Sequence, residues 1–169
     1  GGRVISKLAD LKPNMIEKLV YVSASSFNSH ENNVNKSVSK EEVNAFIKNR
    51  YPTISSGQLS DFKYPENYPL WDDKYEELLK FKGFARALIS TVKNHKNLDL
   101  ENKEISDSNK KVYTIWGDSD SVVIFNDIKG KLNKLLPNRF EYTVPNSGHL
   151  PHIENQSDFE KYLFEVVLK

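Results

Sequence analysis

The chain has 169 residues, a length that suits one domain with a buried core, and its formal net charge of +1 gives no overall signal for nucleic acid or a membrane surface. It contains no cysteine, which excludes disulfides, metal-thiolate sites and a cysteine nucleophile, and which favours a cytoplasmic location. No apolar run approaches the roughly 18 residues needed to span a bilayer.

The first apolar patterns predict a helix followed by a strand. Residues 1–11 carry apolar side chains at helical spacing, and Pro13 ends the pattern. Residues 18–23 (Lys-Leu-Val-Tyr-Val-Ser) form a short run rich in β-branched residues. Such a run is typical of a strand that is buried on both faces of a parallel sheet.

The next stretch is too long for a simple crossover between parallel strands, so residues 27–108 are predicted to contain an inserted helical cap. The cap is expected to begin with a polar stretch at 28–36. A helix should follow that begins at a capping box of Ser39 and Glu42 and stops at Pro52. An apolar helical pattern then runs from Asp72 to Asn94 with an interruption at Gly83, and a charged, turn-like stretch at 97–111 comes last.

The last part of the chain, residues 109–169, alternates strands with helices. The expected elements are a strand at Val112–Trp116, a helix from Phe125 to Leu136, an edge-type strand at Phe140–Val144 and a last helix capped by Asn155. Together with residues 1–26, this order predicts an α/β fold with a parallel sheet. Sites in such sheets form at the carboxyl ends of the strands.

Asp120 and His149 each follow a predicted strand directly, so both are expected at the same edge of the sheet. A carboxylate that accepts a hydrogen bond from a histidine fixes its tautomer and stabilises its charged form, as in a catalytic triad. Asp118 is the competing carboxylate on the first loop, and His152 is the competing histidine on the second. Glu154 is expected to brace the histidine loop or to cap the helix that follows.

These motifs, in this order, resemble the C-terminal half of an α/β hydrolase. The family has a strand that ends in Trp-Gly-x-x-Asp, here Trp116 to Asp120, and a later strand that leads to Gly-His, here Gly148-His149. The resemblance implies the C-terminal part of an α/β-hydrolase parallel sheet with an inserted helical cap. It also implies that Asp120 and His149 are the acid and the base of the triad. Unlike many members, the chain has no proline soon after Asp120.

The family's nucleophile lies on a Gly-x-Ser-x-Gly-Gly turn that opens a helix. Gly1-Gly2, followed by the helical pattern of residues 1–11, resembles the end of that turn. The resemblance then places the nucleophile two positions before Gly1, outside this chain. The alternative interpretation is that the two glycines are a remnant of an expression tag. Ser23, Ser25, Ser26 and Ser147 do not lie on such a turn.

The function that the resemblance implies is hydrolysis of carboxylic esters by a Ser-His-Asp triad, with lipid-like esters such as monoacylglycerols as the expected substrates. An aspartate nucleophile, as in epoxide hydrolases and dehalogenases, and a binding protein without turnover are the alternatives. The expected partners are a small apolar ester and the missing N-terminal half of the hydrolase domain, with no nucleic acid, no metal and no cofactor. This chain alone is expected to be inactive. The residues expected to contact substrate are Trp71, Phe84, Val122 and Leu150; for the two aromatic residues, packing within the cap is the competing interpretation.

Overall fold

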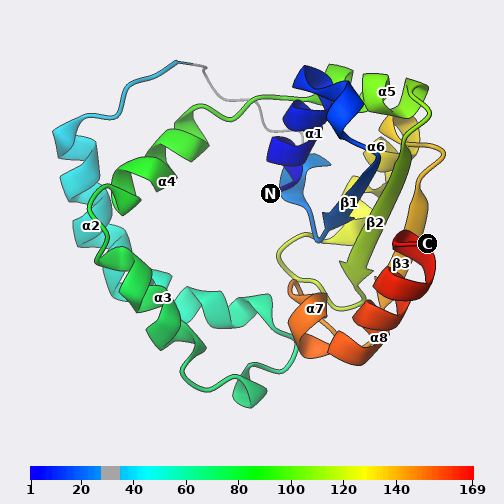
Figure 1. The fold of residues 1–169 in the computed structure, drawn as a ribbon. Coiled ribbons are helices and arrows are strands. Elements are labelled where there is room, and N and C mark those ends of the chain that lie inside the picture. Colours follow the sequence, from blue (N-terminus) through cyan, green and yellow to red (C-terminus); the bar gives the residue numbers. More distant parts are fainter. Residues whose placement is uncertain (28–34) are drawn as a thin grey trace. The chain divides into compact units, whose positions relative to one another are not determined.

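A computed structural model describes residues 1–27 and 35–169 (Figure 1). Most of the polar stretch predicted at 28–36 therefore lies outside the described residues. The chain divides into two compact units. The first, which we call the core unit, comprises Gly1–Asn28, Asp61–Tyr64 and Leu98–Lys169, and the second unit comprises Ser29–Ser60 and Pro65–Asn97.

The core unit is built on a parallel sheet with the strand order β1-β2-β3. The strands are β1 (Lys18–Val22), β2 (Lys111–Gly117) and β3 (Phe140–Val144). Every residue of β2 after the first is buried. Burial on both faces was expected for β1 and is wrong there, because β1 is fully buried only at alternate positions. Within the described residues β1 pairs with a single strand, so it is less enclosed than β2.

Three helices cover one face of the sheet: α1 (Gly2–Leu11), α5 (Asp99–Asp107) and α6 (Phe125–Leu135). Their apolar side chains pack against alternate strand residues such as Leu19 and Trp116. Burial of this apolar surface is the main force that holds the sheet to the helices. The cluster consists chiefly of Ala9, Leu19, Tyr21, Phe27, Ile105, Val112, Trp116, Ile128, Leu132 and Leu136.

Helix α5 corrects the expectation of a turn-like stretch at 97–111. Only two of its residues are buried, Asn102 and Ile105, so its sequence lacks a strong apolar stripe. A buried polar contact fixes it instead, since the Ser6 hydroxyl of α1 lies 2.9 Å from Oδ1 of Asn102 and 2.8 Å from the Tyr21 hydroxyl of β1.

The chain ends on the other face of the sheet with α7 (Pro151–Glu154), α8 (Gln156–Tyr162) and a π-helical turn, η5 (Leu163–Val167). Tyr162 of α8 stacks on Tyr142 of β3, with ring centroids 4.2 Å apart. The predicted cap at Asn155 is present, because its side chain accepts a hydrogen bond from the backbone N–H of Asp158. The core unit is thus a sheet between two helical layers (Figure 1).

The second unit contains α2 (Lys40–Ile54), α3 (Trp71–Leu79) and α4 (Phe84–Lys93). The capping box predicted at the start of α2 is confirmed. The predicted stop at Pro52 is wrong, because Pro52 lies in the last turn of the helix, where it removes only one hydrogen bond. Gly83 does separate two helices and has a φ of 92°. Short 3₁₀ turns complete the chain at Pro13–Met15, Ser25–Phe27, Ser56–Asp61 and Pro65–Asn67.

Candidate active site

The loops after β2 and β3 lie against each other because the two strands end in register, with Gly117 opposite Val144. The backbone N–H of Asp118 donates to the Val144 carbonyl at 3.1 Å, which extends the sheet pairing beyond the strand. The N–H of Ser119 then donates to the Ser147 carbonyl at 2.9 Å. These bonds place the loop after β2, which carries Asp120 and which we call the aspartate loop, beside the loop after β3, which carries His149 and which we call the histidine loop.

Asp120 and His149 meet at this edge. Nδ1 of His149 lies 3.0 Å from Oδ2 of Asp120. The other carboxylate oxygen of Asp120 accepts the backbone N–H groups of Val122 and Val123, at 2.9 and 2.8 Å. The Asp120 side chain is only 1% exposed, against 22% for His149. The Asp120 carboxylate is therefore held in one position by its hydrogen bonds, while part of the His149 imidazole remains accessible to a reactant.

The electrostatic surroundings favour the protonated form of His149. Its hydrogen bond to Asp120 raises the pKa of the imidazole above the usual value for histidine, against the opposing effect of partial burial. The negative charges of Asp120 and Asp61 act in the same upward direction. Burial also raises the pKa of the Asp61 carboxyl, and the nearby Asp120 adds to that shift.

Asp118, the competing carboxylate, braces the histidine loop. It accepts the backbone N–H of Asn146 at 2.9 Å and that of Ser147 at 3.3 Å. Burial acts to raise the pKa of Asp118, but hydrogen bonds from the Ser119 hydroxyl and from these two N–H groups lower it overall. The bonds also hold Asn146 in the left-handed region, with φ of 54°, where the chain turns out of β3.

The residues expected to contact substrate fall in both units. Val122 is 47% exposed and follows Asp120 closely, and Leu150 follows His149 directly. Trp71 and Phe84 begin helices α3 and α4 of the second unit. The Phe84 ring packs edge-to-face on Tyr75, with centroids 6.0 Å apart, which agrees with packing inside that unit. Substrate contact by these four residues stays a prediction.

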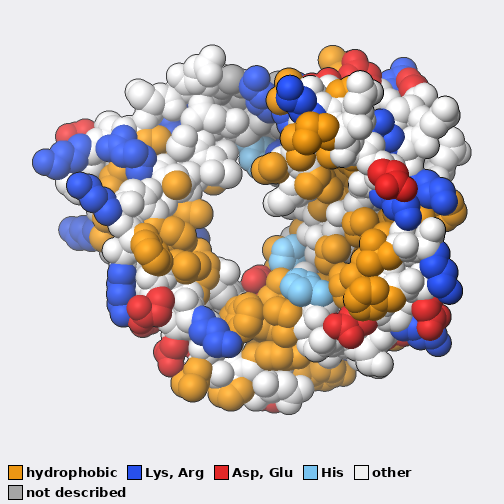
Figure 2. Space-filling view, in the orientation of Figure 1, with side chains coloured by type: hydrophobic (Ala, Val, Ile, Leu, Met, Phe, Trp, Pro, Cys, Tyr) orange, Lys and Arg blue, Asp and Glu red, His pale blue; other side chains and the backbone are white. Residues whose placement is uncertain are grey.

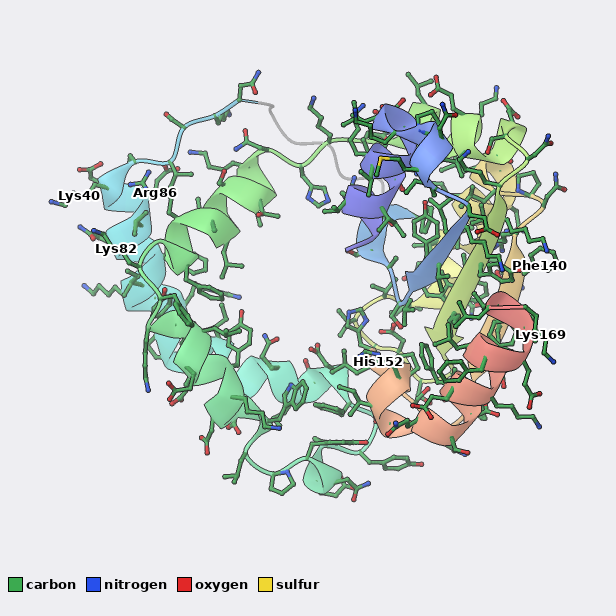
Figure 3. All side chains as sticks on the ribbon, viewed as in Figure 1. Lys40, Lys82, Arg86, Phe140, His152 and Lys169 are labelled. Atoms are coloured by element: carbon green, nitrogen blue, oxygen red, sulfur yellow. The ribbon has the colours of Figure 1, made fainter. Side chains whose placement is uncertain are left out.

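His152, the competing histidine, belongs to α7 and is exposed (Figure 3). Its ring packs near Phe159 of α8, with centroids 5.9 Å apart. The hydrogen bond to Asp120 belongs to His149. Ser147 is fully buried and its hydroxyl donates to the Val144 carbonyl at 2.9 Å, which gives it a structural position.

Sequence reasoning missed the segment Asp61–Tyr64, which it assigned to the cap. This segment belongs to the core unit, and its Asp61 carbonyl accepts the backbone N–H of His149 at 2.7 Å. Its one signal in the sequence is Phe62, an aromatic residue that is only 6% exposed. The bonds themselves use backbone groups, which leave no trace in a sequence pattern.

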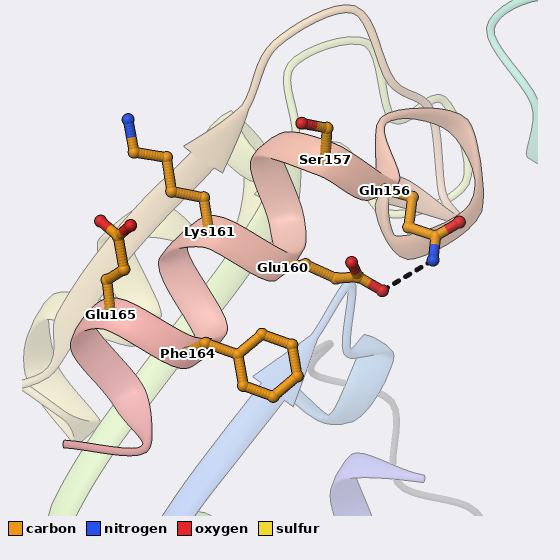
Figure 4. Close-up of a pocket in the computed structure, with 6 residues that line it drawn as sticks. All are labelled: Gln156, Ser157, Glu160, Lys161, Phe164 and Glu165. Carbon is orange, nitrogen blue, oxygen red and sulfur yellow. Dashed lines mark hydrogen bonds between the residues drawn. The ribbon is translucent and has the colours of Figure 1, made fainter.

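Two pockets lie in this part of the core unit. One, of about 230 Å³, is bordered by Asp120, Trp116 and Phe125 among others, and so adjoins the carboxylate. The other, of about 640 Å³, is an open surface pocket along the C-terminal helix (Figure 4). It is lined by Gln156, Ser157, Glu160, Lys161, Phe164 and Glu165.

Within residues 1–27 and 35–169, no group of three or more histidine, cysteine, aspartate or glutamate side chains is arranged to hold a metal ion. Among the helices of the same ranges, none has the length and apolar character required to cross a membrane.

Known proteins resemble the chain over almost its whole length. It is 26% identical over 183 residues to the uncharacterized hydrolase YugF of Bacillus subtilis (strain 168), an alignment that covers 99% of this chain and 62% of YugF. A 2-hydroxy-6-oxo-6-phenylhexa-2,4-dienoate hydrolase from Rhodococcus sp. strain RHA1 has a TM-score of 0.71 at 17% identity, covering 100% of this chain and 61% of that one. The esterase EaEST from Exiguobacterium antarcticum has a TM-score of 0.70 at 16% identity, with coverage of 100% and 64%.

No protein-family profile matches the chain. The chain spans less than two thirds of the length of each of the three proteins above. At these identities the two structural likenesses establish the fold of the chain.

Proposed function

We propose that this chain, which has the α/β-hydrolase fold, is the C-terminal part of a serine hydrolase that acts on carboxylic esters. The observation that carries the proposal is the 3.0 Å contact between Nδ1 of His149 and Oδ2 of a buried Asp120. With Nδ1 committed to the carboxylate, Nε2 is the ring nitrogen left to exchange a proton with a reactant. An aspartate that orients a histidine in this way is the supporting half of a catalytic triad.

In the proposed reaction, a serine hydroxyl outside this chain attacks the ester carbonyl while Nε2 of His149 takes its proton. Asp120 stabilises the resulting imidazolium ion, and backbone N–H groups stabilise the oxyanion. His149 then gives the proton to the departing alcohol, which leaves an acyl-enzyme. Water, activated by the same histidine, releases the acid and restores the serine.

The packing of Gly2 supports a nucleophile two positions before Gly1. A Cβ atom on Gly2 would lie 2.3 Å from Oγ of Ser26 and 2.9 Å from Cβ of Ala24. Helix α1 therefore begins where only glycine fits against the turn after β1. The last glycine of a Gly-x-Ser-x-Gly-Gly turn would meet such a requirement, whereas a tag remnant would not require it.

The surface of α1 supports a second chain segment as partner. Figure 2 shows hydrophobic side chains gathered at the surface over this helix, and Val4, Leu8 and Leu11 are 70%, 44% and 63% exposed. Among the described residues, β1 pairs on one edge only. We infer that the N-terminal half of the hydrolase domain covers this helix and adds a strand beside β1, because an exposed strand edge is a template for pairing.

The experiment is a steady-state assay of the protein that contains this chain, using p-nitrophenyl esters of increasing acyl length. Apolar acyl groups are the proposed substrates, so kcat/KM should rise from acetate toward longer acyl chains. His149→Ala should lower kcat by about 10³-fold or more, because the general base is lost. His152→Ala is the matched control and should change kcat less than about threefold, because the contact with Asp120 is made by His149 and not by His152. If the protein turns over an alkyl halide or an epoxide and hydrolyses no ester, the proposed serine nucleophile is wrong and an aspartate nucleophile is indicated instead.

A further inference from the structure

The segment Asp61–Tyr64 enters the core unit between two stretches of the second unit. Within the core unit it contacts Glu154 of α7. The backbone N–H of Lys63 donates to Oε1 of Glu154 at 2.7 Å, and the N–H of Tyr64 reaches the same oxygen at 3.4 Å. One carboxylate oxygen therefore holds this segment by its backbone.

The other oxygen of Glu154 holds the histidine loop, because Oε2 accepts the backbone N–H of Gly148. The next N–H, that of His149, donates to the Asp61 carbonyl at 2.7 Å. A single carboxylate thus joins the two segments, and a direct backbone bond closes the connection at the histidine itself. We call Glu154 with Asp61–Tyr64 the clamp.

The close fit at Gly148 shows how tightly the clamp is packed. A Cβ atom there would lie 2.6 Å from the Asp61 carbonyl oxygen and 2.8 Å from the Lys63 nitrogen. The two backbones can approach this closely only because Gly148 has no side chain. Any side chain at this position would have to push the two backbones apart.

We propose that Glu154 is a positioning residue: through the clamp it fixes the backbone at Gly148 and His149 and so holds the imidazole against Asp120. The role as a positioning residue for catalysis rests on the proposed function of His149. A carboxylate suits this task because each of its oxygens can accept charge-assisted hydrogen bonds from backbone N–H groups. Glutamine cannot replace it, because its NH₂ group would face one of those donors.

The clamp also has a consequence for the second unit. Both ends of Asp61–Tyr64 continue into that unit along the chain. The position of His149 should respond to any change that pulls Asp61–Tyr64 away from Glu154.

The test compares Glu154→Gln with Glu160→Gln in the protein that contains this chain. Glu160 is a matched control, a partly buried carboxylate in the same C-terminal region that accepts a hydrogen bond only from the side chain of Gln156 among the contacts described. In Glu154→Gln, hydrogen exchange at the amides of Gly148 and His149 should become at least about tenfold faster. The pKa of His149, followed by NMR of its ring protons, should fall, and kcat should fall about 10- to 100-fold with KM little changed.

A second variant approaches the clamp from the other side. Gly148→Ala pushes Asp61–Tyr64 away but keeps the charge of Glu154, so a lower pKa of His149 in this variant cannot come from loss of that charge. The effects of the two substitutions on kcat should be much less than additive, because both open the same connection.

The NMR measurements keep the clamp separate from the chemistry. Exchange rates and a His149 pKa that match those of Glu160→Gln in both clamp variants would overturn the proposal, even in a protein that hydrolyses esters. If the protein hydrolyses no ester, the proposed function fails, while faster exchange and a lower pKa in both variants would still support the clamp. If Glu154→Gln does not fold, the hydrogen-exchange rates and the pKa of His149 measured in Gly148→Ala decide whether the clamp positions His149.

Discussion

Gly117, at the end of β2, lies against the backbone of Gly148 on the histidine loop. A Cβ atom on Gly117 would be 1.9 Å from the Gly148 carbonyl oxygen and 2.5 Å from that of Ser147. The glycine of the Trp-Gly-x-x-Asp motif and the glycine of the Gly-His motif are therefore parts of one contact. This contact sets the distance between the aspartate loop and the histidine loop.

Gly117→Ala should displace the histidine loop and lower the free energy of unfolding by about 3 kcal/mol, near the upper end for overpacking. The overlap is with backbone atoms, which cannot rotate aside as a side chain would. Gly130→Ala is the matched control. Gly130 lies in α6 with open space around it, so there the same substitution should raise the free energy of unfolding by about 0.5–1 kcal/mol. Urea denaturation of both variants measures the difference; equal effects would contradict this account of Gly117.

Asp120→Asn should retain the fold and lose activity. An asparagine side-chain oxygen can still accept the N–H groups of Val122 and Val123. Its amide group would favour the wrong tautomer of His149 and could not stabilise the imidazolium ion, so kcat should fall roughly 10⁴-fold. Ester hydrolysis and circular dichroism test the two parts. Activity within tenfold of the unsubstituted protein would show that Asp120 is not the orienting acid.

Asp118→Asn should lower the stability of the fold and change kcat little, the reverse of what is expected for Asp120→Asn. Both carboxylate oxygens of Asp118 accept backbone N–H groups of the histidine loop, and asparagine keeps only one acceptor oxygen. We expect the free energy of unfolding to fall by about 1–2 kcal/mol, with kcat reduced less than about tenfold. A loss of kcat as large as that of Asp120→Asn would give Asp118 the catalytic role instead.

The pH dependence of activity follows from the raised pKa of His149. The base must be neutral to take a proton, so the acidic limb of the kcat/KM profile should lie above about pH 6.5, the ordinary value for histidine. Asp61→Asn removes one of the charges that raise this pKa, and should move the limb toward lower pH. A limb below the ordinary value, or a shift to higher pH in Asp61→Asn, would contradict the electrostatic account.

The same shift predicts the direction of a stability change. A histidine whose pKa is higher in the folded than in the unfolded state stabilises the fold when it is protonated. The contribution of His149 is fully present below about pH 6.5 and is lost as the pH rises through its folded value. Denaturant titrations across this range should show the loss, and His149→Ala should remove it.

Much of the core unit could be predicted because its elements bury regular apolar patterns. The strand at Lys111–Gly117 and the helix at Phe125–Leu135 were expected almost at their observed bounds. Helix α5 was not, because a buried Asn102 takes the place of an apolar contact. The continuation of α2 past Pro52 was also missed, since the pattern alone does not show that a proline falls in the last turn.

The candidate site also contains features that could be predicted from the sequence and features that could not. Asp120 and His149 follow strands that end in register, so their meeting at one sheet edge could be expected from residue order. The clamp could not, because it depends on backbone atoms of Asp61–Tyr64 that any sequence possesses. The bracing expected of Glu154 is observed, but its partners across the chain emerge only from the three-dimensional structure.

The most direct test of the central claim is to label the protein that contains this chain with a fluorophosphonate probe and to locate the modified residue by mass spectrometry. The account predicts a single modified serine in the sequence before Gly1-Gly2, and near-complete loss of labelling in His149→Ala. It also predicts that the 169-residue chain alone remains unlabelled. Labelling of a serine within residues 1–169, or labelling that persists without His149, would contradict it.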